Sequence, residues 1–308
     1  MGAAARAAER GTARPVLIGA EEELRDLCRK RRHDEALFAF ADVADEAYGA
    51  QLVDRFAPPE GSMLSRKGVA KRVSDPLHRA LIMEAVGDVD ATFAGFDSTT
   101  GEVVLAAQTV IGRKEGIVTP SSFGIVETER FADAQGPLIG FGDSTVCVSP
   151  NPEMLACIAI SCCDTFRTLV GRTPRCAMLS FSTCGSASDD EAEKVRRAVA
   201  IAQRQRPDLI IDGEFQLDAA MNAVIAAKKV KRESAVAGRA DLLVWPCLEA
   251  GNIGIKLIQQ FGDVKTYGAF LQGFKKPVCE LSRGDTAQTL FDGIAFASVL
   301  AAEGGFHA

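Results

Sequence analysis

Short apolar runs alternate with longer amphipathic segments along most of the chain. Buried parallel strands are continuous apolar runs, whereas helices that cover a sheet repeat their apolar positions every three to four residues. The alternation therefore predicts an α/β fold with a mainly parallel sheet. Strands are expected at Val16–Ile18, Ala91–Ala94, Cys176–Phe181, Leu209–Ile211, Leu242–Trp245 and Val278–Glu280. Helices are expected at Glu21–Lys30, Pro76–Val86, Pro152–Val170, Glu191–Gln205, Ala219–Lys229, Ile253–Phe261 and Ala287–Ala302.

Local signals refine three of the connections. The first residues carry Arg6, Glu9 and Arg10 where a signal peptide needs an apolar core, so we expect a short helix that leads into a strand. The stretch Ala57–Gly68 is expected to form a loop or lid. Val110–Glu115 is a candidate hinge.

Composition and charge exclude two classes of partner. The chain has 308 residues, of which 47% are apolar and 25% are charged, as in an ordinary globular protein of one large domain or two. The formal net charge of −6 does not favour binding to a nucleic-acid backbone, which needs clustered Lys and Arg. Since no run reaches about 18 apolar residues, no membrane span is expected.

Nine cysteines and three histidines are present, and none of the cysteines forms a C-x-x-C pair. This argues against a zinc site. The cysteines are interpreted as small buried hydrophobic residues in a reducing cytoplasm. Cys184 and Cys279 lie close to the motifs described next, and a packing role is expected for each.

In open parallel sheets, ligands bind beyond the carboxyl ends of the strands, so the chemistry is sought there. The first such end holds Ser180, Ser182, Thr183, Gly185 and Ser186 before a predicted helix. Hydroxyls and backbone N–H groups in this arrangement can bind an anion. They also occur in an ordinary turn with capping serines, and both interpretations stay open.

The second strand end carries the carboxylates of Asp212, Glu214 and Asp218. Carboxylates suit hard divalent cations, but loop and helix capping is the preferred interpretation, so no metal site is predicted. The third end carries Asn252 between Gly251 and Gly254 at an expected helix start, where glycine would allow a ligand to approach the backbone. Neither dinucleotide nor P-loop motifs occur.

The fourth strand end reads Glu280-Leu-Ser282-Arg283-Gly284 and leads into a helix. Arginine beside the free N–H groups of a helix N-terminus makes a good phosphate receptor. Asp285 and Gln288 have the spacing of a capping box. One helical face is expected to carry Asp285, Thr289 and Asp292.

Taken together, the four motifs resemble the phosphate acetyltransferase / phosphate butyryltransferase family, over most of the chain from Asp75-Pro76 to Ala297. The resemblance implies two Rossmann-like three-layer α/β/α domains with largely parallel sheets and an active-site cleft between them. The domains are expected at 1–114 plus 270–308 and at 115–269. The implied reaction converts acyl-CoA and phosphate into acyl phosphate and CoA, in a homodimer. The chain is expected to open on a helix where family members usually open on a strand.

The resemblance also implies roles. Ser282 and Arg283 match the serine and arginine that hold the substrates. The hypothesis is direct transfer in a ternary complex, in which Arg283 binds the phosphoryl group, Ser282 donates a hydrogen bond, Asp285 acts as base and Thr289 lines the site. CoA is a substrate, and no cofactor or metal is required. Further candidate substrate contacts are Ser180, Ser182, Thr183, Gly185, Asn252, Gly254, Thr99, Thr100 and Arg66.

Two positions depart from the acetyl branch of the family. Thr289 replaces an acid proposed to deprotonate CoA, and Leu105 replaces an arginine. Both departures resemble the butyryl branch, whereas the central motifs resemble the acetyl branch, so an acetyl, propionyl or butyryl group is possible. The alternative function is a catalytically weak relative that binds CoA esters as a regulatory or sensing protein. A metal- and nicotinamide-dependent decarboxylating dehydrogenase has less support, because a cofactor loop and a carboxylate triad are missing.

Overall fold

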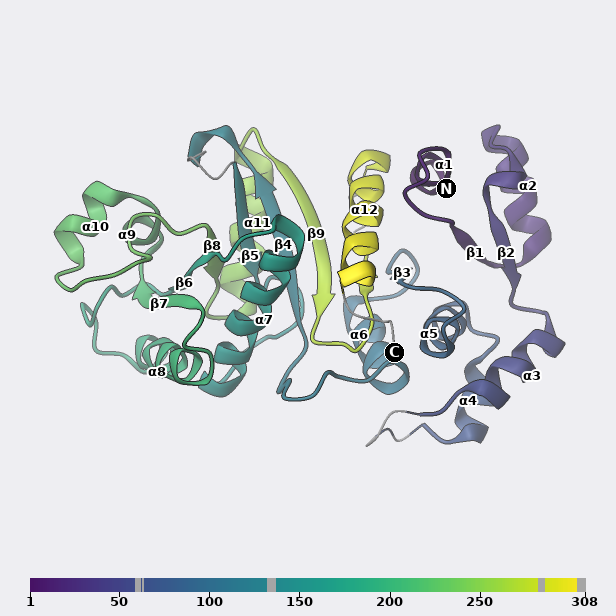
Figure 1. Ribbon diagram of the computed structural model, residues 1–308, viewed down its shortest axis with the longest axis horizontal. Helices are drawn as coiled ribbons and strands as arrows, with labels where there is room; N and C mark the ends of the chain where they lie inside the picture. The colour runs from purple at the N-terminus through teal and green to yellow at the C-terminus, as the bar shows by residue number, and fades with distance from the viewer. Residues whose placement is uncertain (59–61, 63, 132–136, 282–285, 304–308) are drawn as a thin grey trace. The chain divides into compact units, whose positions relative to one another are not determined.

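The computed structural model describes residues 1–58, 62, 64–131, 137–281 and 286–303. The chain divides into two compact units, which Figure 1 colours by residue number. Unit 1 contains Met1–Lys114 and Phe274–Ala308, and unit 2 contains Glu115–Gly273. The expected α/β class with mostly parallel strands is confirmed. Within the described ranges, no helix has both the length and the hydropathy that a membrane span needs.

Unit 1 carries the two ends of the chain. Its helices are α1 (Gly2–Glu9), α2 (Glu21–Arg31), α3 (Glu46–Arg55), α4 (Arg66–Arg72), α5 (Pro76–Val86), α6 (Thr100–Val110) and α12 (Ala287–Glu303), with a 3₁₀ turn η1 at Glu35–Leu37. Its strands are β1 (Val16–Gly19), β2 (Ala39–Asp42), β3 (Thr92–Ala94) and β10 (Val278–Glu280). The strands form two parallel pairs, β1 with β2 and β3 with β10.

A buried arginine joins several segments of unit 1. Arg79 of α5 is only 1% exposed, and its guanidinium donates to the backbone carbonyls of Val73 at 2.7 Å and Asp42 at 2.6 Å. The same group reaches the carbonyls of Val43 and Asp45 at 3.2 and 3.3 Å. Because these N–H groups all donate to backbone carbonyl oxygens, the charge can be buried. Arg79 thereby ties the end of β2 and the start of α3 to the end of α4.

Unit 2 contains most of the sheet. Its strands are β4 (Ser121–Glu127), β5 (Leu138–Gly142), β6 (Arg175–Leu179), β7 (Ile210–Phe215), β8 (Leu242–Val244) and β9 (Lys265–Gln272). Its helices are α7 (Pro152–Val170), α8 (Asp190–Gln205), α9 (Leu217–Met221), α10 (Ala223–Lys229) and α11 (Leu248–Phe261), with a 3₁₀ turn η2 at Glu129–Phe131. The strand order is β9-β4-β5-β8-β6-β7, in which β4 runs antiparallel to both neighbours and the other pairs are parallel.

Helices cover both faces of the unit 2 sheet. Gly140 and Gly142 of β5 face α7, where an added Cβ would lie 2.8 Å from Phe166 and 2.2 Å from the Sγ of Cys162. Alternate residues of a strand point to opposite faces. Phe141 accordingly stacks on Trp245, in a cluster against which α11 packs. Glycine at two positions of β5 therefore lets α7 lie directly on the sheet.

Two of the predicted helices are confirmed at both ends. The helices α5 and α7 have the expected bounds, and each begins with a capping side chain followed by proline. Asn151 accepts from the N–H of Met154 at 2.8 Å, and Gly171 ends α7 in a left-handed conformation with φ +78°. The caps fix these ends because they satisfy backbone groups that the helix itself leaves open.

Several expectations about element bounds were wrong. The helix expected at Ala219–Lys229 is interrupted at Asn222, whose side chain accepts from Val224 and starts α10. The strand β7 continues to Phe215, so Asp212 and Glu214 lie within it and not beyond its end. The helix α11 begins at Leu248, five residues before the expected start. Part of the expected lid at Ala57–Gly68 begins α4, and 59–61 and 63 lie outside the described residues.

Candidate functional site

In unit 1, the parallel strands β3 and β10 bring two candidate motifs together at their carboxyl ends. The N–H of Leu281 donates to the carbonyl of Ala94 at 2.7 Å, and the hydroxyl of Thr100 donates to the carboxylate of Glu280. Gly95 has φ +121°, and an added Cβ would lie 2.7 Å from the carbonyl oxygen of Leu281. Glycine is therefore needed where the two chain segments leave the sheet side by side.

The two threonines at the start of α6 have different partners. Thr99 is the N-cap of α6 and forms a capping box with Glu102, whose carboxylate accepts from the Thr99 N–H at 2.7 Å. This backbone hydrogen bond, followed by one from the Thr99 hydroxyl, lowers the pKa of Glu102. Thr100 instead reaches Glu280, as described above. Both threonines therefore lie beside the strand ends, and the contact to Glu280 belongs to Thr100.

The start of α12 is closed by a reciprocal pair of threonines. The N–H of Thr286 donates to the Thr289 hydroxyl at 2.9 Å, and the N–H of Thr289 donates to the Thr286 hydroxyl at 3.2 Å. This is the arrangement of a capping box, with Thr289 in the position that usually holds Glu or Gln. Gln288 instead donates to Asp292 at 2.8 Å. Thr289 therefore serves as a helix cap in this chain.

Three of the four predicted catalytic residues, Ser282, Arg283 and Asp285, lie outside the described residues. Arg66, a predicted phosphate contact, is the first residue of α4 and forms an exposed ion pair with Asp54 of α3. Leu105, the departure from the acetyl branch, lies on α6 and is 62% exposed.

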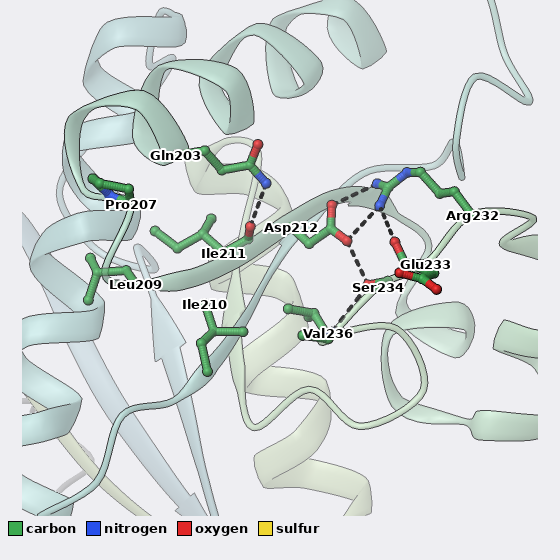
Figure 2. Close-up of a pocket in the computed structure, with 11 residues that line it drawn as sticks. Gln203, Pro207, Leu209, Ile210, Ile211, Asp212, Arg232, Glu233, Ser234 and Val236 are labelled. Carbon is green, nitrogen blue, oxygen red and sulfur yellow. Dashed lines mark hydrogen bonds and ion pairs between the residues drawn. The ribbon is translucent and has the colours of Figure 1, made fainter.

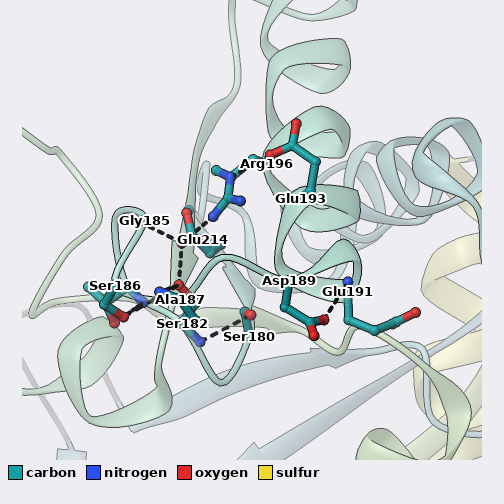
Figure 3. A network of polar contacts seen from close by, with 12 residues as sticks. Ser180, Ser182, Gly185, Ser186, Ala187, Asp189, Glu191, Glu193, Arg196 and Glu214 are labelled. Carbon is teal, nitrogen blue, oxygen red and sulfur yellow. Dashed lines mark hydrogen bonds and ion pairs between the residues drawn. The ribbon is translucent and has the colours of Figure 1, made fainter.

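In unit 2, the loop between β6 and α8 wraps around a buried carboxylate. Ser182 and Gly185 donate to one oxygen of Glu214 at 2.7 and 2.8 Å, and Arg196 of α8 donates to the same oxygen at 3.1 Å (Figure 3). Burial opposes the charged form, yet the Gly185 N–H, the Ser182 hydroxyl and Arg196 hold the pKa of Glu214 below its ordinary value. The loop does receive an anion, and that anion is a side chain of the same chain.

Other donors of this loop are also paired internally. The N–H of Thr183 donates to the Ser186 hydroxyl at 3.0 Å, and the N–H of Ala187 donates to the Ser182 hydroxyl at 3.1 Å. The Ser180 hydroxyl accepts from the N–H of Ser182 at 3.2 Å (Figure 3). Ser182 and Thr183 are buried. Of the four predicted contacts in this loop, Gly185 is exposed and Ser180 half-buried.

The role expected for Cys184 differs from the one that the structure shows. Its side chain is exposed, so the expected packing role is wrong, although seven of the nine free cysteines are buried. Cys184 also has φ +49°, a left-handed conformation that is uncommon for residues other than glycine. Its N–H donates to the carbonyl of Glu214 at 3.2 Å, which holds it there. Partial burial raises the pKa of the Cys184 thiol, against the effect of Arg232.

The loop after β5 is organised by a second buried carboxylate, Asp143, which sequence reasoning missed. It accepts from the N–H groups of Ser122, Thr145, Val146 and Cys147, at 3.0, 3.1, 3.2 and 2.6 Å, and from the Ser122 hydroxyl. The available signal was an aspartate directly after the apolar run that forms β5.

The Gly251–Gly254 motif packs α11 against this loop. Asn252 donates to the carbonyl of Ser144 at 3.2 Å. An added Cβ on Gly251 would lie 2.4 Å from the carbonyl of Asp143, and one on Gly254 would lie 2.7 Å from Trp245. The glycines therefore allow close packing of α11 within the protein. The expectation that they mark a helix start was wrong, because α11 begins at Leu248.

The carboxylates of the second motif each have their own partner. Asp212 pairs with Arg232 at 2.7 Å and accepts from the Ser234 hydroxyl at 2.6 Å (Figure 2), whereas Asp218 pairs with Lys229 at 2.8 Å. Among the described residues, no group of His, Cys, Asp and Glu is arranged to hold a metal ion.

A cavity of about 440 Å³ lies beside β7, the last strand in the order (Figure 2). Gln203 donates to the carbonyl of Ile211 at 2.8 Å, and Arg232 donates to that of Gly213 at 3.1 Å. Side chains thus occupy carbonyls of an edge strand, where another strand could otherwise pair.

Comparison with known proteins agrees with these motifs. A model of the phosphate acetyl/butaryl transferase family matches residues 1–298. The phosphate acetyltransferase of Borreliella burgdorferi is 41% identical over 250 residues, which cover 78% of this chain and 70% of that protein. That of Treponema pallidum is 36% identical over 283 residues, covering 90% and 84%. The phosphotransacetylase structure from Streptococcus pyogenes has a TM-score of 0.86 at 32% identity and covers 98% of this chain and 90% of that one.

Proposed function

Since this chain belongs to the phosphate acetyl/butaryl transferase family, we propose that it transfers an acetyl group between coenzyme A and inorganic phosphate. The observation that carries the proposal is the likeness to the Streptococcus pyogenes phosphotransacetylase over nearly the whole of both chains. Relatives named phosphate acetyltransferase, at 36 and 41% identity, support the same choice of acyl group.

The proposed mechanism is direct transfer in a ternary complex. A phosphate oxygen attacks the thioester carbonyl, an acyl–oxygen bond forms, and the acyl–sulfur bond breaks as CoA leaves and takes up a proton. In the reverse direction a base must remove the thiol proton, because a thiol with a pKa near ~8.5 is mostly protonated at neutral pH. The sequence motif assigns phosphate binding to Arg283, hydrogen bonding to Ser282 and the base to Asp285. CoA is a substrate, and the chemistry calls on no metal or other cofactor.

Unit 1 offers Glu280 as a second candidate for the base that removes the thiol proton. Glu280 stands at the carboxyl end of β10, in contact with Thr100 and two residues before the Ser282-Arg283 motif in the sequence. It is the natural comparison for Asp285. We expect Asp285→Asn to lower kcat by about a hundredfold, the scale of general-base catalysis, and Glu280→Gln to lower it less. The opposite order would move the base from Asp285 to Glu280.

The length of the acyl chain is a finer proposal. Leu105 is an exposed apolar side chain on α6 where the acetyl branch has an arginine. We propose that acetyl-CoA is the best substrate and that propionyl- and butyryl-CoA are also used. The purified protein should release free thiol from each ester only when phosphate is present. If butyryl-CoA has the highest kcat/KM, the acetyl assignment is wrong.

A regulatory protein that binds CoA esters is the second candidate function, because Thr289 caps a helix where the acetyl branch places an acid. The same assay separates the two. Binding of acetyl-CoA, measured by calorimetry, without phosphate-dependent release of thiol would favour the regulatory function.

We further propose a homodimer that forms through α11. Glycines and the inner side chains of α11 face the sheet, whereas Ile253, Leu257 and Phe261 repeat every four residues on the exposed side, and Phe261 is 86% exposed. A helix that is apolar on both sides is normally covered on both sides. A second copy of the same stripe is self-complementary across a two-fold axis. We expect Leu257→Glu to convert a dimer into a monomer by light scattering, whereas Val224→Glu, at an exposed valine of α10, should not. A monomeric wild type would refute the proposal.

All nine cysteines are free thiols. Together with the sequence, this supports placement in a reducing compartment, the cytoplasm.

A further inference from the structure

Three buried side-chain oxygen atoms lie together in unit 1, where α5 packs on β3. They are the two carboxyl oxygens of Glu84 and the hydroxyl of Thr92, and none of them has a hydrogen-bond partner among the residues that the structure describes. The Thr92 hydroxyl is nonetheless close enough to influence the charge of the Glu84 carboxyl group. Since buried polar groups are normally paired, this cluster requires an explanation.

The cluster lies beside the first residues of the β3–β10 pair. The N–H of Thr92 donates to the carbonyl of Pro277 at 3.2 Å, and Thr92 pairs in register with Val278. Lys276, just before β10, donates to the backbone carbonyl of Glu84. Each strand of the pair has three residues. A pair this short has few hydrogen bonds with which to resist local opening.

The charges around Glu84 do not compensate for its burial. Burial has the largest effect and raises the pKa of Glu84 to about 8, although the Thr92 hydroxyl and the Lys276 ammonium favour the charged form. Asp90 disfavours it. Cys279 of β10 is also buried, and the pKa of its thiol is raised by burial and by the charge of Glu84. An ionised Glu84 therefore acts directly on β10.

The other ionisable side chains on the elements around α5 face elsewhere. The strand β1 has none, and Glu102 of α6 caps its own helix. On α3, α5 and β10, these side chains are exposed or bind other partners: Glu46, Tyr48, Asp54, Arg55, His78, Arg79 and Glu280. Lys276 and Asp90 are therefore the charges that act on Glu84, and they oppose each other.

We propose that Glu84 is a pH-sensitive switch for the β3–β10 pair: the protonated carboxyl group is tolerated beneath α5, and loss of its proton to solvent drives a local opening of β10 away from β3 and α5. In the open state, water solvates the carboxylate. Because Glu280 at the end of β10 accepts from the Thr100 hydroxyl, the opening also releases this contact. The inference concerns unit 1 alone and does not depend on the proposed function.

Alkylation of Cys279 by iodoacetamide measures the opening, because the buried thiol reacts only when it is exposed. Dividing its rate by that of N-acetylcysteine at the same pH removes the titration of the thiol itself. An open state in which Glu84 has its ordinary pKa gains about tenfold in population per pH unit between 4.5 and about 8. We expect the relative rate, followed by peptide mass spectrometry, to rise about tenfold per pH unit from pH 6 to 8 and then to level off.

Cys28 is the control cysteine. It is also fully buried in unit 1, in a separate cluster with Ala5 and Phe38. Its relative rate should be lower than that of Cys279 at pH 8, or should lack the rise. The same rate and the same rise for both cysteines would mean that unfolding of the whole unit exposes them. That outcome, or a relative rate of Cys279 that does not change with pH, would overturn the proposal.

Variants identify the titrating group. Glu84→Gln keeps the shape and removes the ionisation, so the relative rate of Cys279 should become independent of pH between 6 and 8. Lys276→Gln removes the positive charge beside Glu84, so the rise should continue to higher pH. This variant serves if Glu84→Gln does not fold. Lys275→Gln, at the exposed neighbouring lysine, is the matched control and should behave as the wild type does. A rise that persists in folded Glu84→Gln, or equal effects of the two lysine substitutions, would show that Glu84 is not the switch.

Discussion

Glu84 in unit 1 and Glu214 in unit 2 are both buried glutamates, and their surroundings differ in one respect. Glu214 receives donors from Ser182, Gly185 and Arg196. Glu84 of α5 is 0% exposed, and neither of its carboxyl oxygens has a hydrogen-bond partner within the described part of the chain. Burial alone raises the pKa of a carboxyl group, and donors lower it. The pair shows the two effects separately.

The pKa values move in opposite directions as a result. Burial raises the pKa of Glu84 to about 8, against opposing effects of Thr92 and Lys276, and Asp90 raises it further. Lys276 donates to the backbone carbonyl of Glu84, and buried Cys279 lies in its field. The pKa of Glu214 is held below its ordinary value. Depth of burial therefore does not decide whether a carboxyl is charged in this protein. The number of donors that reach it does.

The largest expected effect is the pH dependence of stability caused by Glu84. Because its folded pKa lies above the unfolded value of 4.5, the folded state binds more protons between pH 4.5 and about 8, so stability falls as the pH rises through that window. We expect Glu84→Gln to remove this slope of about 1.4 kcal/mol per pH unit. Urea denaturation at pH 5, 6, 7 and 8 would measure it.

Glu46→Gln, at an exposed position in the first turn of α3, is the control for this measurement. The free-energy difference between this variant and the wild type should stay constant over the same pH range. If the free-energy difference between Glu84→Gln and the wild type is also constant over this pH range, the pKa of Glu84 is not raised. Its carboxyl group would then have hydrogen-bond donors, and the contrast with Glu214 would be wrong.

The second prediction removes a donor from Glu214. Ser182→Ala takes away the hydroxyl that reaches the carboxylate and leaves the N–H of Ala187 without it. We expect a loss of about 2 kcal/mol at pH 7, the scale of a hydrogen bond to a buried charge. Since the folded pKa is depressed, the stabilisation is present above the unfolded value of 4.5 and disappears as the pH falls through the folded pKa.

Chemical denaturation at pH 7 and pH 4 would check both parts. The loss should be smaller at pH 4 than at pH 7, and Ser188→Ala, at an exposed serine of the same connection, should lose less than 0.5 kcal/mol, as surface substitutions usually do. Equal losses for Ser182→Ala at the two pH values would mean that the charge of Glu214 is not what the hydroxyl stabilises.

The sequence predicted the parts of this architecture that local patterns control. Apolar runs located six strands, and the helical repeat of apolar positions located α5 and α7 at both ends. The strands β4, β5 and β9, which form the two antiparallel pairs, were missed, together with β2, α3, α4 and α6. Their pairing joins residues far apart in the chain, such as Ser121 with Gln272, and no local pattern reports such a contact.

The site was predicted as a set of motifs, but the partners within it were not. The Ser180–Ser186 loop was found from its composition, and its two possible roles stayed open. Only three-dimensional contact between β7, α8 and this loop shows that Glu214 supplies the anion and Arg196 the countercharge. Likewise, the sequence showed that position 289 holds threonine and not an acid, but it placed the capping box at Asp285 and Gln288. The hydrogen bonds between Thr286 and Thr289 show that Thr289 is the capping residue.

The smallest expected effect on stability comes from substitutions at Thr289. An aspartate at this position extends the comparison of Glu84 and Glu214 to a carboxylate that is not buried. Thr289→Asp places an acid near the N-terminus of α12, where backbone N–H groups and the helix dipole favour negative charge. The stability should stay within about 1 kcal/mol of the wild type, whereas Thr289→Val, which cannot accept from the Thr286 N–H, should lose about 1 kcal/mol. If an acid at this position deprotonates CoA, Thr289→Asp should also raise kcat for CoA with acetyl phosphate, and Thr289→Asn should not. A kcat equal to that of the wild type, in a variant as stable as the wild type, would leave Asp285 and Glu280 as the carboxylates to test for the base.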